Sequence, residues 1–468
     1  MPCLKATWIV QSCRALITLL VLMITLCGGA NRIDGQTPPT SAPSEVLTLE
    51  KAINLALESN REVQNASLEA QKAKDNAAAF RTHRLPTIKT YSLLSKPLTG
   101  FRLTVDRGAL GTFPATGPVP SENTIISSST KPTALVFGSV SQPLSQLWRI
   151  NFGLKALEAN EEISEAQLRA KQQDVVKNVK QAYYGILQTQ SAFESANETI
   201  KLYRELDRIT GEYFAQQVVL KPDLLEVHTK LARSEYELLV LQNQLATQKE
   251  QFNDLLGRAA QTDFGVSSAL EVTDFVMRDA DLVAAHERAL AQRPELAEAR
   301  ARIKQAEFDR RAKKAEYLPD VSLNLNYLSP FSFSDFLPKN IVHAGILVEW
   351  EVFDWGRKKH ELAAKSRTVE QATNYLRETE NRIAIDVNTR YRKLREASQL
   401  LRVARLAQEA AAANVTVMSN RYRVQASLLK DVLQVQTSLA DANFQYQKAL
   451  LGFWTAKAEF EKATGEDK

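Results

Sequence analysis

The sequence repeats itself over most of its length, so any fold for this chain must accommodate two copies of one unit. Residues 49–86 align with 282–319 without a gap, and both copies close with a Leu-Pro pair, at Leu85 and Leu318. A repeat of this length indicates an internally duplicated unit rather than a short-period solenoid. The later parts align at a second, smaller offset, which pairs Tyr183 with Tyr391, Asp223 with Asp431 and Gly257 with Gly465.

Each unit is predicted to contain a helix, two strands and a long helical hairpin. With only 17 Gly and 16 Pro among 468 residues, the composition favours long helices. Proline ends the first helix of each unit because it cannot donate the helical hydrogen bond. We expect first helices at about 49–84 and 282–317, strands at 86–94, 134–144, 320–327 and 343–353, and long outgoing helices at about 151–217 and 356–425, whose returning partners end near Gly257 and Gly465.

The returning helices carry a heptad pattern, as in Leu224, Leu231 and Leu238. A period of about 3.5 residues keeps one apolar stripe facing a partner as two helices supercoil. The predicted fold class is therefore mainly α with a small β part, in which a helix, two strands and a coiled-coil hairpin occur twice. In residue ranges, we expect the first repeat at 48–260, a connector at 261–279, the second repeat at 280–465 and a short tail at 466–468.

Positions 1–30 are typical of a secretory signal peptide. Lys5 and Arg14 precede a short apolar run, and small residues follow it near Ala30. Residues 31–47 then form a polar linker rich in proline and serine. Acylation of Cys27 as a lipoprotein stays an alternative, although Leu26 before it is larger than that signal prefers. All three cysteines lie within 1–30, so the mature chain is expected to lack thiol chemistry.

The strand at 320–327 alternates strictly between apolar and small polar residues. Transmembrane β-strands typically alternate in this way over their whole length, with one face toward lipid and one toward an aqueous lumen. Glutamates in the strand at 343–353 are expected to face the lumen too, because a carboxylate facing hydrocarbon is costly. The predicted lumen-facing residues are Ser322, Asn324, Asn326, Glu349 and Glu351.

Aromatic residues mark the expected boundaries of the membrane. Trp148, Trp350 and Trp355 stand at junctions between strands and helices, and Tyr327 is also placed among the interface aromatics. Four strands cannot close a barrel, and an open sheet edge in lipid leaves backbone groups unpaired. The chain is therefore expected to oligomerise, and three copies would supply twelve strands.

Other functional classes find little support in the residues. The net charge of +5 comes from 59 basic and 54 acidic residues, with no compact basic run to contact nucleic acid. The five histidines are scattered and no cysteine follows Cys27, so neither a metal site nor a Cys/His enzyme is indicated. We expect no cofactor and no enzymatic activity. A periplasmic adaptor or coiled-coil tether without a pore is the alternative, since it would also contain long helical hairpins.

Three motifs, taken with the duplicated order, carry a family resemblance. They are FDWGR at 353–357, YRVQASLLKDVLQVQ from Tyr422, and ALLGFWTAKAEFEKATG, which ends at Gly465. The chain resembles the TolC-like outer membrane efflux family over roughly 47–465. The resemblance implies a homotrimer in the cell outer membrane, with a twelve-stranded β-barrel continuous with a periplasmic α-helical barrel. It also implies docking on a periplasmic adaptor and an inner-membrane transporter, in either efflux or type I secretion.

The same resemblance places a gate at the turns between the long helices. Asp431 matches a constriction aspartate of the family, and Gln434 stands where a second one is expected. Tyr422 and Asp223 resemble a tyrosine and an aspartate that join neighbouring hairpins in the closed state. The family's arginine partner corresponds to Ser427 here. For both aspartates the alternative is a simple helix cap, because each stands near the start of a returning helix.

Overall fold

The computed structural model describes residues 45–96, 98–100, 102–127, 132–267, 279–331, 338, 340–424 and 426–466. The predicted signal peptide, residues 31–44 of the predicted linker and residues 268–278 of the predicted connector lie outside these ranges. The chain divides into two compact units, Met1–Val46 and Leu47–Lys468. The second unit contains the long helices and the main sheet.

Long helices dominate the unit. The longest, α4, has 69 residues and so extends for about 100 Å at 1.5 Å per residue. No helix within the described ranges combines the length and apolarity needed to cross a lipid bilayer. The helices are α2 (Leu49–Ser59), α3 (Arg61–Arg81), the short 3₁₀ helix η1 (Thr82–Arg84), α4 (Leu147–Ala215), α5 (Lys221–Leu255), α6 (Asp279–Gln292), α7 (Pro294–Ala315), α8 (Arg357–Arg423) and α9 (Leu429–Thr464).

The first helix of each unit is broken, and the prediction of one continuous helix is wrong in both copies. In the first copy Asn60 adopts an extended conformation, and its side-chain oxygen accepts hydrogen bonds from the backbone N–H groups of Glu62 and Val63. It thereby caps α3. In the second copy Pro294 is the first residue of α7, and it holds Arg293 in an extended conformation.

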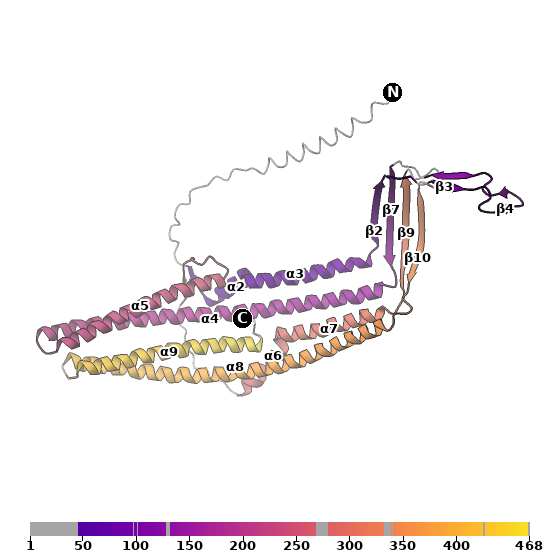
Figure 1. The fold of residues 1–468 in the computed structure, drawn as a ribbon. Coiled ribbons are helices and arrows are strands. Elements are labelled where there is room, and N and C mark those ends of the chain that lie inside the picture. The colour runs from indigo at the N-terminus through magenta and orange to yellow at the C-terminus, as the bar shows by residue number, and fades with distance from the viewer. Residues whose placement is uncertain are drawn as a thin grey trace, which may run out of the picture. The chain divides into compact units, whose positions relative to one another are not determined.

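Four antiparallel strands form the main sheet, in the order β10-β9-β7-β2. Figure 1 shows this sheet at one end of the helices and the α4–α5 and α8–α9 turns at the other end. The four strands expected from the sequence are thus present. They are β2 (Thr87–Ser95), β7 (Thr133–Pro143), β9 (Asp320–Phe331) and β10 (Ile341–Glu349), and the shorter strands are β1 (Glu45–Leu47), β3 (Arg102–Val105), β4 (Thr112–Phe113), β5 (Gly117–Pro118), β6 (Thr124–Ser127) and β8 (Phe264–Val266).

The duplication extends into the hydrophobic core. One buried cluster joins α2, α3, α4 and α5, and another joins α6, α7, α8 and α9. Under the two sequence offsets, five buried residues of the first cluster have equivalents in the second, so equivalent side chains help to hold each short helix pair against its own long hairpin. The equivalent buried residues are Ala52 and Ala285, Ala56 and Ala289, Val63 and Leu296, Val175 and Ile383, and Val179 and Val387.

The broken helix and the end of the returning helix meet in a joint in each copy. In the first joint the side-chain amide of Asn60 donates to the carbonyl oxygen of Leu255 at 2.8 Å. In the second joint the guanidinium of Arg293 donates to the carbonyl oxygen of Ala463 at 3.3 Å. Gly257 and Gly465 follow these carbonyl groups with φ of 72° and 84°. Different residues therefore make the same connection in the two copies.

Candidate functional site

Strand β9 of the main sheet has one apolar side and, from Ser322 to Asn326, one polar side. Directly paired antiparallel residues point to the same side, and Leu325 of β9 is paired with Val140 of β7 and with Ala344 of β10. On β9 this apolar side is the more exposed one. Leu325 has 46% of its surface accessible, whereas Ser322 on the opposite face has 9%. A sheet of a water-soluble protein buries its apolar face instead, so this face requires an apolar surrounding.

The polar face contains four of the five predicted lumen-facing residues. Ser322, Asn324 and Asn326 lie there on β9, and the pairing of Glu349 with Asp320 places Glu349 on the same side. Asn324 donates to the Ser322 hydroxyl at 3.0 Å, and Asn326 lies 3.2 Å from the ring nitrogen Nε2 of His343. Neighbouring strands continue this polar face with Ser139, Ser141 and Gly345.

Glu351 does not belong to this face, and the predicted strand end at Phe353 is wrong. The strand β10 ends at Glu349, because the following segment turns toward α8. The Glu351 carboxylate instead forms ion pairs with Arg357 at 2.5 Å and with Lys358 at 3.4 Å. It therefore fixes the start of α8.

The FDWGR segment has a local structural role at the same junction. The Asp354 carboxylate accepts hydrogen bonds from the backbone N–H groups of Gly356 at 3.0 Å and Lys358 at 2.8 Å. Chiefly the Lys358 bond lowers the pKa of Asp354. Trp355 and Gly356 both have positive φ, so the chain turns sharply between strand and helix. Asp354 thus caps the N-terminus of α8, which is 67 residues long.

Three of the predicted interface aromatics gather at the junctions between sheet and helices. Trp148 lies in the first turn of α4, Trp350 follows β10, and Trp355 packs edge-to-face on Phe353 with ring centroids 4.8 Å apart. All three tryptophans are exposed. Tyr327 lies apart from them, about 23 Å along β9 from Asp320 at roughly 3.3 Å per residue. Its hydroxyl donates to the side-chain oxygen of Asn340 at 2.7 Å.

At the other end of the helices, Asp223 and Asp431 occupy equivalent capping positions. The Asp223 carboxylate accepts from the backbone N–H of Leu220 at 3.0 Å, and that of Asp431 accepts from Leu428 at 3.3 Å. Each is the third residue of its helix, where a carboxylate also interacts favourably with the helix dipole. Capping is therefore observed for both. Asp431 and Gln434 are exposed, so a role in a pore is compatible with the cap.

Tyr422 connects the two hairpins of one chain near this tip. Its side chain is buried, its hydroxyl lies 3.3 Å from that of Thr210 on α4, and its ring packs edge-to-face on Tyr213. Burial raises the pKa of the Tyr422 hydroxyl, and the nearby Asp223 carboxylate raises it too. Sequence reasoning missed Thr210 as the partner. The signal was a threonine on α4 next to the apolar residues Leu206 and Ile209, all three of which are buried.

Both the sequence and the fold are similar to those of known proteins. The sequence profile described as outer membrane efflux protein matches residues 52–258 and 285–466. Among solved structures, the outer-membrane channel OprN is 16% identical, with a TM-score of 0.71 and 89% of each chain covered. The Campylobacter jejuni CmeC outer membrane channel is 14% identical, with a TM-score of 0.70 over 94% of each chain.

A third solved structure, the open state of the Neisseria gonorrhoeae MtrE outer membrane channel, is 16% identical, with a TM-score of 0.66 over 94% of this chain and 95% of that one. No curated protein sequence matches the chain. At these identities the solved structures show the fold, while the sequence profile, which spans most of both repeats, shows the family. The resemblance inferred from the motifs is confirmed. The chain therefore belongs to the outer membrane efflux protein family, whose members are outer-membrane exit ducts of efflux systems.

Proposed function

We propose that three copies of this chain close a twelve-stranded barrel in the outer membrane and continue it with a tube of long helices in the periplasm. The observation that carries the proposal is strand β9, whose exposed side is apolar and whose less exposed side is polar from Ser322 to Asn326. The edge strands of the main sheet, β2 and β10, each have one partner among the described strands of a single chain. An unpaired strand edge is unfavourable in lipid, and neighbouring copies would pair both edges.

The duct would conduct substrates passively, without enzymatic activity. Its tip, formed by the α4–α5 and α8–α9 turns, would face a periplasmic adaptor and an inner-membrane transporter. Trp148, Trp350 and Trp355 would then mark one interface of the membrane and Tyr327 the other, since about 23 Å of tilted strand separates the two levels. The four exposed cations of the tip, Lys221, Arg421, Arg423 and Lys430, would lie near the docking surface.

Asp431 is proposed to line the constriction and to make it prefer cations, with Gln434 as a neutral neighbour. A ring of like carboxylates in a narrow pore raises the local cation concentration. In a planar bilayer, Asp431→Ala is expected to move the reversal potential in a salt gradient toward the value of a non-selective pore. Asp431→Asn is the matched variant, because its side-chain oxygen can still accept from the Leu428 N–H while the charge is lost.

Both Asp431 variants are expected to shift selectivity alike, and only Asp431→Ala is expected to lose helix stability as well. A reversal potential that stays unchanged in both variants would assign Asp431 to the cap alone. Failure of folded, membrane-extracted protein to insert and conduct at all would count against the duct itself.

Tyr422 is proposed to help hold the tip closed through its hydroxyl bond to Thr210. Tyr422→Phe keeps the buried ring and removes the bond, whose net contribution is about 0.5–1.5 kcal/mol. If the bond exists only in the closed state, the ratio of open to closed channels should rise by about 2- to 12-fold. Single-channel open probability measures this ratio.

Thr210→Val is expected to raise the open probability as Tyr422→Phe does, and the double variant should add little to either single change. Tyr236→Phe, which changes an exposed tyrosine of α5, is the control that should leave gating unaltered. Additive effects of Tyr422→Phe and Thr210→Val would contradict a shared bond.

A further inference from the structure

The contact between the two repeats inside one chain offers a template for the contact between chains. Helix α4 of the first repeat packs against α7 and α9 of the second repeat. Under the two sequence offsets, α4 corresponds to α8, α9 to α5 and α7 to α3. The equivalent seam would therefore join α8 to α5 and α3. In a closed ring of three copies, which is the assembly proposed above and on which this inference rests, α8 of one copy would meet α5 and α3 of the next.

An ion pair of the intrachain seam has an equivalent with exchanged signs. Lys462 of α9 binds Asp174 of α4 at 2.5 Å. At the offset that pairs Gly257 with Gly465, the equivalent positions carry Asp254 on α5 and Arg382 on α8. Both of these side chains are exposed on the single chain, with 77% and 64% of their surface accessible. The charges are thus complementary across the proposed seam.

Apolar residues far along the same seam show the same relation. Ile209 of α4 and Leu433 of α9 are buried in one cluster. Their equivalents, Val417 of α8 and Leu225 of α5, are 50% and 51% exposed on the single chain. Ile209 lies about 50 Å beyond Asp174 along α4, at 1.5 Å per residue. An ion pair and a buried apolar cluster of the intrachain seam, well separated along α4, therefore have matching but exposed equivalents.

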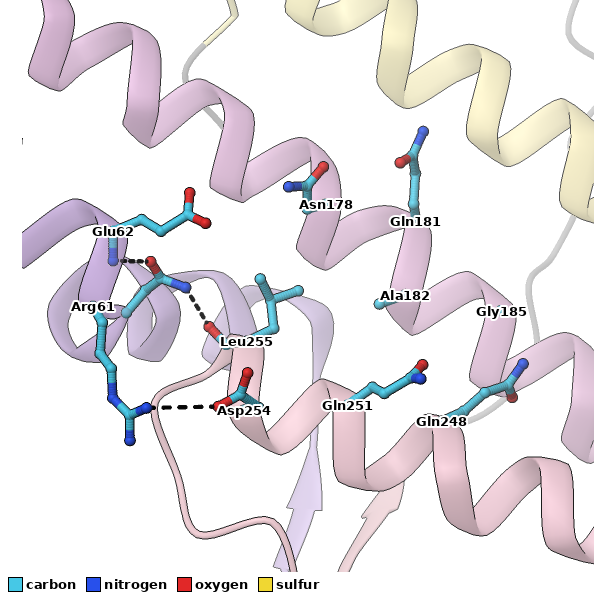
Figure 2. Close-up of a pocket in the computed structure, with 11 residues that line it drawn as sticks. Arg61, Glu62, Asn178, Gln181, Ala182, Gly185, Gln248, Gln251, Asp254 and Leu255 are labelled. Carbon is cyan, nitrogen blue, oxygen red and sulfur yellow. Dashed lines mark hydrogen bonds and ion pairs between the residues drawn. The ribbon is translucent and has the colours of Figure 1, made fainter.

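A hollow of about 630 Å³ is lined mostly by polar residues, Asp254 among them. Figure 2 shows the side chains that line it. The hollow lies between α4, α5 and the break at Asn60, and its walls include the side-chain amides of Gln248 and Gln251. The Asp254 carboxylate forms only a loose ion pair with the guanidinium of Arg61, at 3.9 Å. Amide oxygens and a carboxylate are the acceptors that a guanidinium group needs, since it has five N–H donors and no acceptor.

The second repeat fills the equivalent place with its own arginine. Arg390 stands at the position equivalent to Ala182 of the hollow, and it forms ion pairs with Asp386 and Glu459. Gln251 stands at the position equivalent to Glu459. The first repeat therefore keeps the space open with the small Ala182, and it has the amide oxygens of Asn178 and Gln251 where the second repeat has carboxylates.

We propose that Arg382 of one copy reaches the polar hollow of the next copy and binds Asp254, in a register that also packs Val417 against Leu225. Arginine suits this contact because its planar group can donate to the carboxylate and to a glutamine side chain together. The hollow is thus a subunit contact that the neighbouring copy completes.

Cysteine cross-linking of the full chain in outer membranes tests the register. Asp254→Cys combined with Arg382→Cys, treated with a short bismaleimide, is expected to give covalent dimers and trimers on a denaturing gel. Each single variant should give monomers only. Asp174→Cys combined with Lys462→Cys is the matched control, and it should cross-link within one chain without raising the mass. Leu225→Cys combined with Val417→Cys should repeat the covalent trimer near the tip.

The outcomes distinguish a wrong register between the copies from the absence of a trimer. If an amine-reactive reagent captures trimers while neither cysteine pair cross-links between chains, the proposed register is wrong and the trimer stands. If every reagent gives monomers alone, both the proposed register and the trimer are wrong. Charge reversal gives a second readout: Asp254→Arg and Arg382→Asp should each lower the temperature at which trimers dissociate on a gel, and their combination should recover most of that loss. No recovery would refute the pairing.

Discussion

Gly257→Ala is expected to destabilise the protein by about 2 to 5 kcal/mol, a sum of the cost of a left-handed backbone at an alanine and the cost of overpacking. Gly257 has a φ of 72°, and a Cβ added there would lie 2.3 Å from the carbonyl oxygen of Ser59. That oxygen belongs to the backbone of the first joint and cannot rotate away. The change should therefore separate α2 from the end of α5 and lower the thermal midpoint, measured by helical circular dichroism in detergent.

Two further glycines serve as graded controls. Gly465 also has a positive φ, 84°, but a Cβ added there would lie nearest to the Cβ of Gln292, at 2.9 Å. Gly465→Ala is therefore expected to lose less stability than Gly257→Ala. Gly452→Ala lies within α9 with nothing within 4 Å, and alanine there should raise stability by up to about 1 kcal/mol. A midpoint for Gly257→Ala equal to that of Gly465→Ala would show that the close approach to Ser59 is relieved at little cost.

The duplication predicted the architecture well because equivalent positions receive equivalent neighbours. The second offset, found from Tyr183, Asp223 and Gly257, superimposes the end of α4 on that of α8 and the start of α5 on that of α9. The same offset exposes where the copies differ. Arg390 in place of Ala182 is a local change in sequence, yet it separates a filled site from an open one.

Helix breaks and strand ends were harder to predict from pattern alone. Pro294 was a usable signal, since proline favours the first position of a helix, whereas Asn60 sits in a continuous helical pattern and breaks it by capping. The alternation that runs through β10 continues to Phe353, but Glu351 finds partners on α8 rather than on a strand. The periodicity of a segment indicates which of its sides is apolar, but it does not indicate which groups accept its hydrogen bonds.

The residues proposed for the gate also show which contacts can be predicted from the sequence and which cannot. The capping role of Asp223 and Asp431 is visible in the sequence, because a cap joins residues three positions apart. The bond between Tyr422 and Thr210 joins residues 212 positions apart, and only the packing of the two hairpins near the tip brings them together. Long-range polar contacts of this kind require the fold, even where a resemblance already marks one partner.

Leu325→Arg is expected to prevent most of the chain from reaching the outer membrane. Leu325 lies near the middle of β9 on the exposed apolar face. A basic residue on the lipid face near the bilayer midplane costs about 2–4 kcal/mol, and the cost would arise three times in a trimer. Asn324→Arg is the matched control, because the adjacent residue lies on the polar face and its arginine would extend into water.

The fraction of chain found in outer membranes as heat-resistant trimer measures the difference between the two variants. Leu325→Arg should lose most of this fraction, while Asn324→Arg should retain it and alter ion selectivity instead. The comparison assigns the faces because both arginines occupy the same depth, so that only the direction of the side chain differs. Equal loss in both variants would mean that neither face meets water within the membrane. A greater loss for Asn324→Arg would reverse the proposed assignment of lumen and lipid.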